Sequence, residues 1–262
     1  MKAARIFFVG GLTSFRALYG WLSPWIYVPT MMIAPIFQIL LFAYIGRAAH
    51  LESDRFYVIG NAIQYASIPC LFAMANTIAG ERQQQTLGAI LASPAPRLPL
   101  FLGRSLPVIA NGVIVAAFGL AVGGLILDVH VPGSAIAPLA LVIVVSAAAC
   151  TGLGLVNAAI GLRVRETAVL SNIIFGFLLV FCGVNVPLDE LPAGMSTIAQ
   201  GLPLTHGIEA ARKLADGQSL AGGAGRLVLA EALVGALWAW GGYLLLRFFE
   251  LQSFRHATLE RA

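Results

Sequence analysis

The chain alternates between long apolar runs and short polar connections. Six runs of about 20 residues carry few charges, and a helix of that length crosses the hydrocarbon core of a bilayer. Helices are expected because backbone groups in lipid must be hydrogen-bonded within their own segment. The pattern therefore predicts an all-α membrane protein with six transmembrane helices. The expected spans are 25–45, 56–79, 106–127, 136–162, 168–187 and 227–249.

Composition supports the membrane class. Hydrophobic residues make up 59% of the 262 residues and charged residues only 11%, whereas about 25% of the residues in a soluble domain are charged. Basic residues indicate the orientation, because cytoplasmic connections are enriched in Lys and Arg. With both termini in the cytoplasm, 11 of the 16 basic residues fall on the cytoplasmic side. We therefore expect both termini inside, and we read the net charge of +4 as a topology signal.

The first 22 residues are amphipathic and precede the first span. Arg16 interrupts the apolar stretch that a cleavable signal peptide would need. We expect 1–22 to form an interfacial helix on the cytoplasmic leaflet, with an unstructured leader as the alternative. The residues that share the apolar face are Phe8, Leu12, Phe15 and Tyr19.

A charged segment at 80–94 separates the second and third spans. Leu87, Ile90 and Leu91 recur at i, i+3 and i+4, which predicts an amphipathic helix with one apolar stripe. Pro94 follows and ends the helix. An ordinary interfacial connector has the same periodicity, so periodicity alone leaves both a connector and a partner-binding helix open.

The chain carries no recognisable nucleotide site of its own. A phosphate-binding P-loop needs a lysine after a glycine, and neither of the two lysines, Lys2 and Lys213, follows one. The motifs of zinc proteases, serine hydrolases and EF-hands are also absent. We therefore expect a protein that is not an enzyme and binds no cofactor itself.

The charged segment follows the pattern Glu-Arg-x-x-x-Thr-Leu-x-x-x-Leu-x-x-Pro. This pattern resembles the cytoplasmic motif of ABC-2-type permeases, the membrane subunits of a class of ABC exporters. Gln85 and Gly88 depart from it, since the family often has glycine and an acidic residue there. The resemblance implies that 80–94 is a coupling helix that docks on a separate ATPase. The matching residues are Glu81, Arg82, Thr86, Leu87, Leu91 and Pro94.

Two further patterns lie between the last two spans. Val-Pro-x-x-x-Leu-Pro occupies 186–192, and Leu-Pro-Leu-Thr-His begins at 202. Both resemble signatures of the same family and imply an outer re-entrant segment at 187–216. Thr205 is a candidate helix N-cap, and we expect Arg212 and Lys213 to anchor the segment at the outer interface. The matching residues are Pro187, Pro192, Pro203, Thr205, His206, Glu209 and Arg212.

Polar groups inside the spans are candidate cargo contacts. A carboxylate in a membrane usually pairs or faces a cavity, so Glu231 either pairs with a nearby arginine, reaches outward, or recognises a cationic cargo. Asn172 is the second candidate for the substrate path, although Asn157 and Asn172 also suit hydrogen bonds between helices. His206 and Glu209 are one turn apart, but a metal site needs more ligands, so we expect no metal.

The resemblance implies a single ABC-2-type transmembrane domain over 1–262 in a bacterial inner membrane. It implies a homodimer, or a heterodimer with a related permease, above two copies of an ABC ATPase that binds ATP and Mg²⁺. The implied activity is export of a hydrophobic small molecule, antibiotic or lipid-like compound, as in drug-resistance and nodulation-factor permeases. Export of a lipid-linked polysaccharide or oligosaccharide, ion-coupled secondary transport and a non-transporting membrane anchor stay open.

Overall fold

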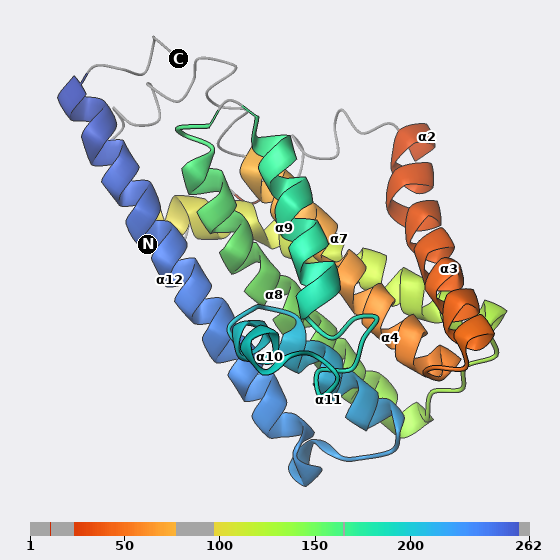
Figure 1. Ribbon diagram of the computed structural model, residues 1–262. Helices are drawn as coiled ribbons and strands as arrows, with labels where there is room; N and C mark the ends of the chain where they lie inside the picture. The colour runs from red at the N-terminus through yellow and green to blue at the C-terminus, as the bar shows by residue number, and fades with distance from the viewer. Residues whose placement is uncertain (1–10, 12–23, 77–96, 165, 257–262) are drawn as a thin grey trace.

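The computed structural model describes residues 11, 24–76, 97–164 and 166–256. These residues form helices and no strand (Figure 1), which confirms the predicted all-α class for this part of the chain. The elements in order are α2 (Pro24–Tyr27), η1 (Val28–Ile33), α3 (Ala34–Ala49), α4 (Asp54–Tyr65), η2 (Pro69–Ala73), α7 (Arg97–Ile126), η3 (Gly133–Ala135), α8 (Ile136–Ile160), α9 (Thr167–Phe181), α10 (Ala193–Gln200), α11 (Thr205–Ala215), η4 (Leu220–Gly222) and α12 (Ala224–His256).

Five helical stretches in the described part of the chain are long and apolar enough to cross a membrane. Each overlaps one of the predicted spans, so the expectation of a multi-pass membrane protein is confirmed. The stretches are Val28–Ala49, Asp54–Asn76, Gly103–Ile126, Gly133–Ile160 and Ala224–Phe249.

The predicted fifth span corresponds to a shorter helix. α9 has 15 residues, which gives about 22 Å of helix against about 30 Å of hydrocarbon. The prediction of a span that continues to residue 187 is wrong for 182–187. Gly183 turns the backbone there with φ +69°, and Arg212 binds the carbonyls of Gly183 and Val184 in place of a next helical turn.

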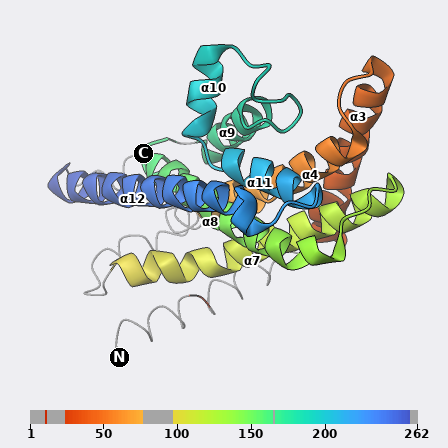
Figure 2. The ribbon, with the colours of Figure 1, turned by 90° about the horizontal axis from the view of Figure 1, so that it is seen from below.

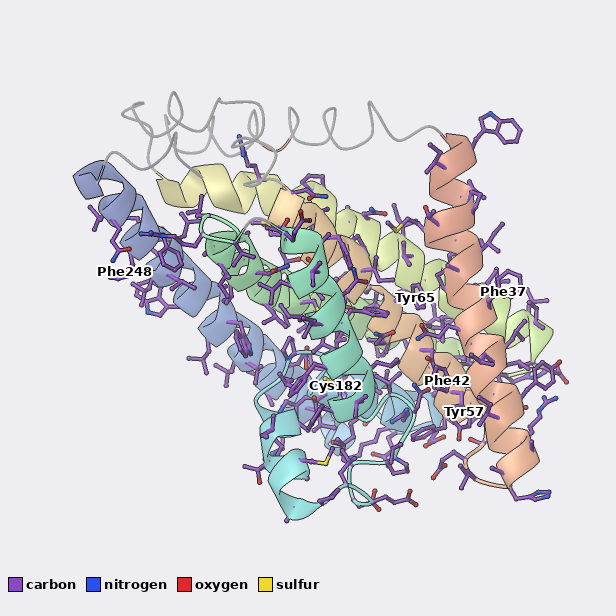
Figure 3. The ribbon with its side chains drawn as sticks, turned by 45° about the horizontal axis from the view of Figure 1, so that its top comes forward. Phe37, Phe42, Tyr57, Tyr65, Cys182 and Phe248 are labelled. Atoms are coloured by element: carbon purple, nitrogen blue, oxygen red, sulfur yellow. The ribbon has the colours of Figure 1, made fainter. Side chains whose placement is uncertain are left out.

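α8 lies at the centre of the bundle. α12 packs along it most extensively, and η2, α7 and α11 also contact it. α3 and α12 lie at opposite edges (Figure 1). Both carry exposed apolar side chains, among them Phe37 on α3 and Phe248 on α12 (Figure 3). Such side chains suit a surface that faces lipid.

Glycines let α8 and α12 approach until their backbones touch. A methyl group on Gly152 would lie 2.6 Å from the carbonyl oxygen of Gly235, and one on Gly235 would lie 2.5 Å from Cα of Ala149. Gly242 would meet the backbone nitrogen of Val156 at 2.9 Å. Small residues drive helix association in membranes because lipid provides no hydrophobic force between helices. We call this contact the α8–α12 seam.

The turn between α3 and α4, the short helices α10 and α11, and the start of α12 gather at one end of the bundle (Figures 1 and 2). The connection between α8 and α9 lies at the other end (Figure 1). Most of the candidate residues that the structure describes lie at the first of these ends.

Candidate functional site

The predicted coupling helix at 80–94 lies outside the described residues. The same holds for the predicted interfacial helix at 1–22, apart from Gly11. The roles assigned to the coupling residues therefore stay predictions. Those residues are Glu81, Arg82, Thr86, Leu87, Leu91 and Pro94.

The segment at 187–216 forms two short helices, as its prolines suggested. Pro187 begins a turn in which its carbonyl accepts from the backbone nitrogen of Glu190. Pro192 occupies the N-cap position of α10, where its fixed backbone angle suits a helix start. The carbonyl of Pro203, before α11, accepts the thiol hydrogen of Cys182 at 3.3 Å. We call residues 187–216 the α10–α11 segment.

Thr205 is not the N-cap of α11, contrary to the sequence prediction. It is the first helical residue, and its hydroxyl donates to the carbonyl of Ala199 at 2.6 Å. Leu204 holds the N-cap position with φ +80°. A positive φ is uncommon for a side-chain-bearing residue and persists only where the surroundings enforce it. The surrounding constraint comes from α12.

Glu231 of α12 caps α11 from a distance of 27 residues along the chain. Its carboxylate accepts from the backbone nitrogen of Leu204 at 2.6 Å and from that of Gly207 at 3.1 Å. The side chain is fully buried. The first amides of a helix lack intrahelical partners and carry partial positive charge, so a carboxylate satisfies both needs.

A second residue of α12 also binds the α10–α11 segment. The indole nitrogen of Trp238 donates to the carbonyl of Gly201 at 2.8 Å. Glu231 and Trp238 are seven residues apart, which places them on one helix face two turns from each other. α12 therefore fixes both the end of α10 and the start of α11.

Arg212 points into the protein rather than to an interface, contrary to its expected role as an anchor. Its guanidinium donates to the carbonyls of Gly183 at 2.7 Å, Val184 at 2.9 Å and Phe56 at 3.2 Å. It also lies over the Phe56 ring, 3.4 Å from the ring centre. Arg212 thus joins α11 to α4 and to the residues after α9.

Burial lowers the pKa of Arg212 to about 9, while the carboxylates of Glu52 and Glu209 act in the opposite direction. The guanidinium therefore stays charged at neutral pH. Hydrogen bonds to a charged donor are stronger than those between neutral groups, so this link is one of the strong contacts of the segment.

The remaining residues of the second signature pair locally. The ring nitrogen Nε2 of His206 lies 3.1 Å from the carbonyl oxygen of Gln200. Glu209 forms an ion pair with Lys213 one turn later, at 2.8 Å. His206 and Glu209 belong to no cluster of three metal-ligating side chains within the described residues.

A cluster of four amide side chains joins α3, α4 and the residues after α9. Gln38 donates through Nε2 to Oδ1 of Asn61 at 2.8 Å and to Oε1 of Gln64 at 3.1 Å. Asn61 donates through Nδ2 to Oδ1 of Asn185 at 2.8 Å. Nε2 of Gln64 is buried without a hydrogen-bond partner. We call Gln38, Asn61, Gln64 and Asn185 the amide cluster.

The sequence prediction missed the amide cluster and the cap. Asn61 and Gln64 are three residues apart inside an apolar span, and that spacing on one helix face was the available signal.

The structure gives different results for Asn157 and Asn172, the two asparagines that the sequence analysis singled out in the spans. Asn157 donates to the hydroxyl of Ser171 at 2.6 Å, which confirms a hydrogen bond between helices. Asn172 is exposed and donates to Ala168 of its own helix.

Comparison with known proteins agrees with the arrangement of these helices and signatures. The family model described as ABC-2 type transporter matches residues 14–215. No curated protein matches the chain. The matched region holds the charged segment before the third span and both short helices α10 and α11 with Arg212. Because this match covers well over half of the chain, the protein belongs to the ABC-2 type transporter family.

Proposed function

We propose that this chain is the permease subunit of an ATP-driven exporter, with both termini in the cytoplasm of a bacterial cell. The observation that carries the proposal is the family match over residues 14–215 in a chain without a phosphate-binding lysine motif. The family supports the transport role, and the proposal assigns ATP hydrolysis to a partner subunit. Residues 1–262 would form one transmembrane domain.

In this proposal two permease chains stand above two ATPase subunits that bind ATP and Mg²⁺. Closing of the ATPases displaces the helix at 80–94 and so shifts the spans between two arrangements. Glu81 and Arg82 transmit this displacement. The fixed body on which it acts is the described bundle, in which α8, α11 and α12 are joined by the α8–α12 seam and by Glu231.

The proposed cargo is a hydrophobic small molecule, antibiotic or lipid-like compound, with a lipid-linked glycan as the alternative. The apolar exposed face of α9 supports a hydrophobic path, and Asn172 is the polar residue of that face which a cargo can reach. Glu231 is fully buried and supports the α10–α11 segment instead. The exposed apolar residues of α9 are Val169, Ile173, Phe177 and Val180.

Reconstitution tests the proposal. The chain and its co-purifying ATPase are placed in proteoliposomes, and ATP-dependent uptake of a hydrophobic dye and of a fluorescent phospholipid is measured. Reversing both charges, with Glu81→Arg and Arg82→Glu, should abolish transport while the ATPase continues to turn over. Glu166→Arg, a charge reversal in the α8–α9 connection, serves as the matched control and should transport normally.

Two results would overturn the proposal. Transport driven by a proton or sodium gradient without ATP would identify a secondary transporter. Unchanged transport and co-purification in the Glu81 and Arg82 double variant would remove the coupling role of 80–94.

A further inference from the structure

A small cavity opens at the end of the bundle that holds the α10–α11 segment. Its volume is about 250 Å³, and it lies between the turn joining α3 to α4 and the residues after α9. Drug-sized ligands occupy cavities of roughly 300 to 1,000 Å³, so this one suits a single chemical group or a small molecule. Its polar lining residues are His50, Glu52, Tyr57, Asn185 and Glu190.

The two carboxylates of this cavity have no ion pair within the described residues. Two other acidic side chains at this end do have one: Asp54 pairs with Arg47 at 2.5 Å and Asp216 pairs with Arg55 at 3.1 Å. Glu52 and Glu190 therefore give the cavity negative charge that no ion pair among the described residues neutralises. Unpaired carboxylates around a cavity attract a cation.

Arg212 is the cation that acts on Glu52, yet it does not close the cavity. Its guanidinium is held by the carbonyls of Phe56, Gly183 and Val184. No ion pair within 4.0 Å joins it to Glu52 in the described structure. Its field weakens the negative potential of the cavity without removing the acceptors.

Two further lining groups have room to accept a hydrogen bond from a bound group. Tyr57 is only 3% exposed, its ring edge packs against Gly46, and no described residue hydrogen-bonds to its phenol oxygen. Asn185 uses Oδ1 to accept from Asn61, which leaves one lone pair of that oxygen available. The phenol oxygen of a nearly buried tyrosine in the wall of a cavity, without a described hydrogen-bond partner, is available to accept from a bound donor.

We propose that this cavity binds an organic ammonium group, whose three N–H groups donate hydrogen bonds to Glu52, Glu190 and Tyr57. An ammonium has only donors and one positive charge, so it matches these three acceptors and the two carboxylates without an ion pair in the described structure. The group belongs either to an amine-bearing small molecule or to the headgroup of an amino-phospholipid. Assigning it to the exported cargo rests on the proposed function, whereas the binding itself does not.

Saturation-transfer NMR on the full chain in uncharged maltoside micelles tests the binding. The probe is hexylammonium chloride, and hexanol is the neutral probe of equal length. We expect a saturable signal for hexylammonium that is weakened about tenfold or more in the double variant Glu52→Gln, Glu190→Gln, as loss of two close charges predicts. Tyr57→Phe, which removes one acceptor, should weaken binding by a smaller factor.

Asp189→Asn is the matched control. It removes the same charge next to Glu190, but Asp189 does not line the cavity, so binding should stay within about twofold of the wild type. Equal saturable binding of hexanol, or equal loss in Asp189→Asn and in the double variant, would overturn the proposal. Circular dichroism and size-exclusion profiles identify any variant that fails to fold.

A second comparison identifies the source of the ammonium. The saturation-transfer signal of hexylammonium is measured in nanodiscs of phosphatidylethanolamine and in nanodiscs of a neutral glucosyl diacylglycerol. Loss only in phosphatidylethanolamine identifies a lipid headgroup as the occupant, and retention in both identifies a soluble amine. These measurements use no nucleotide and no ATPase, so failure of ammonium binding and failure of ATP-driven export can be told apart.

Discussion

The carboxylate of Glu231 binds the backbone nitrogen of Leu204 at 2.6 Å, and Leu204 there has φ +80°. A membrane-embedded acid thus supports an unfavourable backbone conformation in a neighbouring segment. This contact explains why a span composed mainly of apolar residues contains a carboxylate.

Glu231→Gln should loosen the start of α11. Glutamine keeps one acceptor oxygen and presents an amide donor to a second backbone donor, so one of the two hydrogen bonds is lost. Leaving a buried donor unpaired costs about 1–3 kcal/mol. Hydrogen–deuterium exchange should show faster exchange at the amides of Leu204 and Gly207. Glu209→Gln, which removes an exposed charge of α11, is the control, and equal exchange in all three proteins would disprove the capping role.

Arg212 should be more important for stability than its neighbour Lys213. Arg212→Lys removes the planar fork that binds Gly183, Val184 and Phe56, and lysine replaces it with one compact ammonium. We expect the free energy of unfolding to fall by about 2 kcal/mol or more, because charged hydrogen bonds contribute about 1.5–3 kcal/mol each. Lys213→Met removes a half-exposed ion pair and should cost well under 1 kcal/mol.

Thermal unfolding in maltoside micelles compares the two variants. A lower unfolding temperature for Lys213→Met than for Arg212→Lys would contradict this ranking.

Gly235→Ala should disrupt the α8–α12 seam. The added methyl group would lie 2.5 Å from Cα of Ala149, and backbone on backbone leaves no flexible side chain to move aside. We expect a marked loss of folded protein in detergent. Gly241→Ala makes the same change in the same helix, where nothing lies within 4 Å, and should be tolerated. Size-exclusion chromatography of the solubilised protein measures the folded fraction, and equal yields would refute the close approach.

The amide cluster should respond differently to two similar substitutions. Asn61→Leu removes the residue that pairs with both Gln38 and Asn185, so two hydrogen bonds of the cluster are lost and the protein should be destabilised by about 1–3 kcal/mol. Gln64→Leu removes one longer hydrogen bond from Gln38 together with an amide nitrogen that is already unpaired, so it should cost less than Asn61→Leu. Thermal denaturation in detergent distinguishes them, and a larger loss for Gln64→Leu would invalidate the assigned hydrogen bonds.

The sequence predicted those features that depend on neighbouring residues. Five of the apolar runs correspond to long helices, because the length of an apolar run determines whether a helix can cross the bilayer. Pro187 corresponds to a turn and Pro192 to a helix start. The end of α9 was not predictable in this way. Its carbonyls bind Arg212, which lies 28 to 29 residues further along the chain.

In the candidate site, too, the features set by neighbouring residues were predictable and the contacts between distant residues were not. Thr205 is a residue type that is common at helix N-caps, but the carboxylate that accepts from the first amides of α11 comes from Glu231 of α12. Asn61 and Asn185 are separated by 124 residues, so no local pattern connects them. Contacts of this kind depend on how helices pack, and packing is not encoded in a window of the sequence.

The α8–α12 seam restricts how the protein can change shape. Where two backbones touch through Gly152, Gly235 and Gly242, sliding by even one residue would drive a side chain into a main chain. α8 and α12 must therefore move together as one rigid unit, and Glu231 attaches the start of α11 to that unit. A displacement of α12 would therefore be carried to α8 and α11, and the flexibility that a transport cycle requires would reside in helices outside this unit, such as α3.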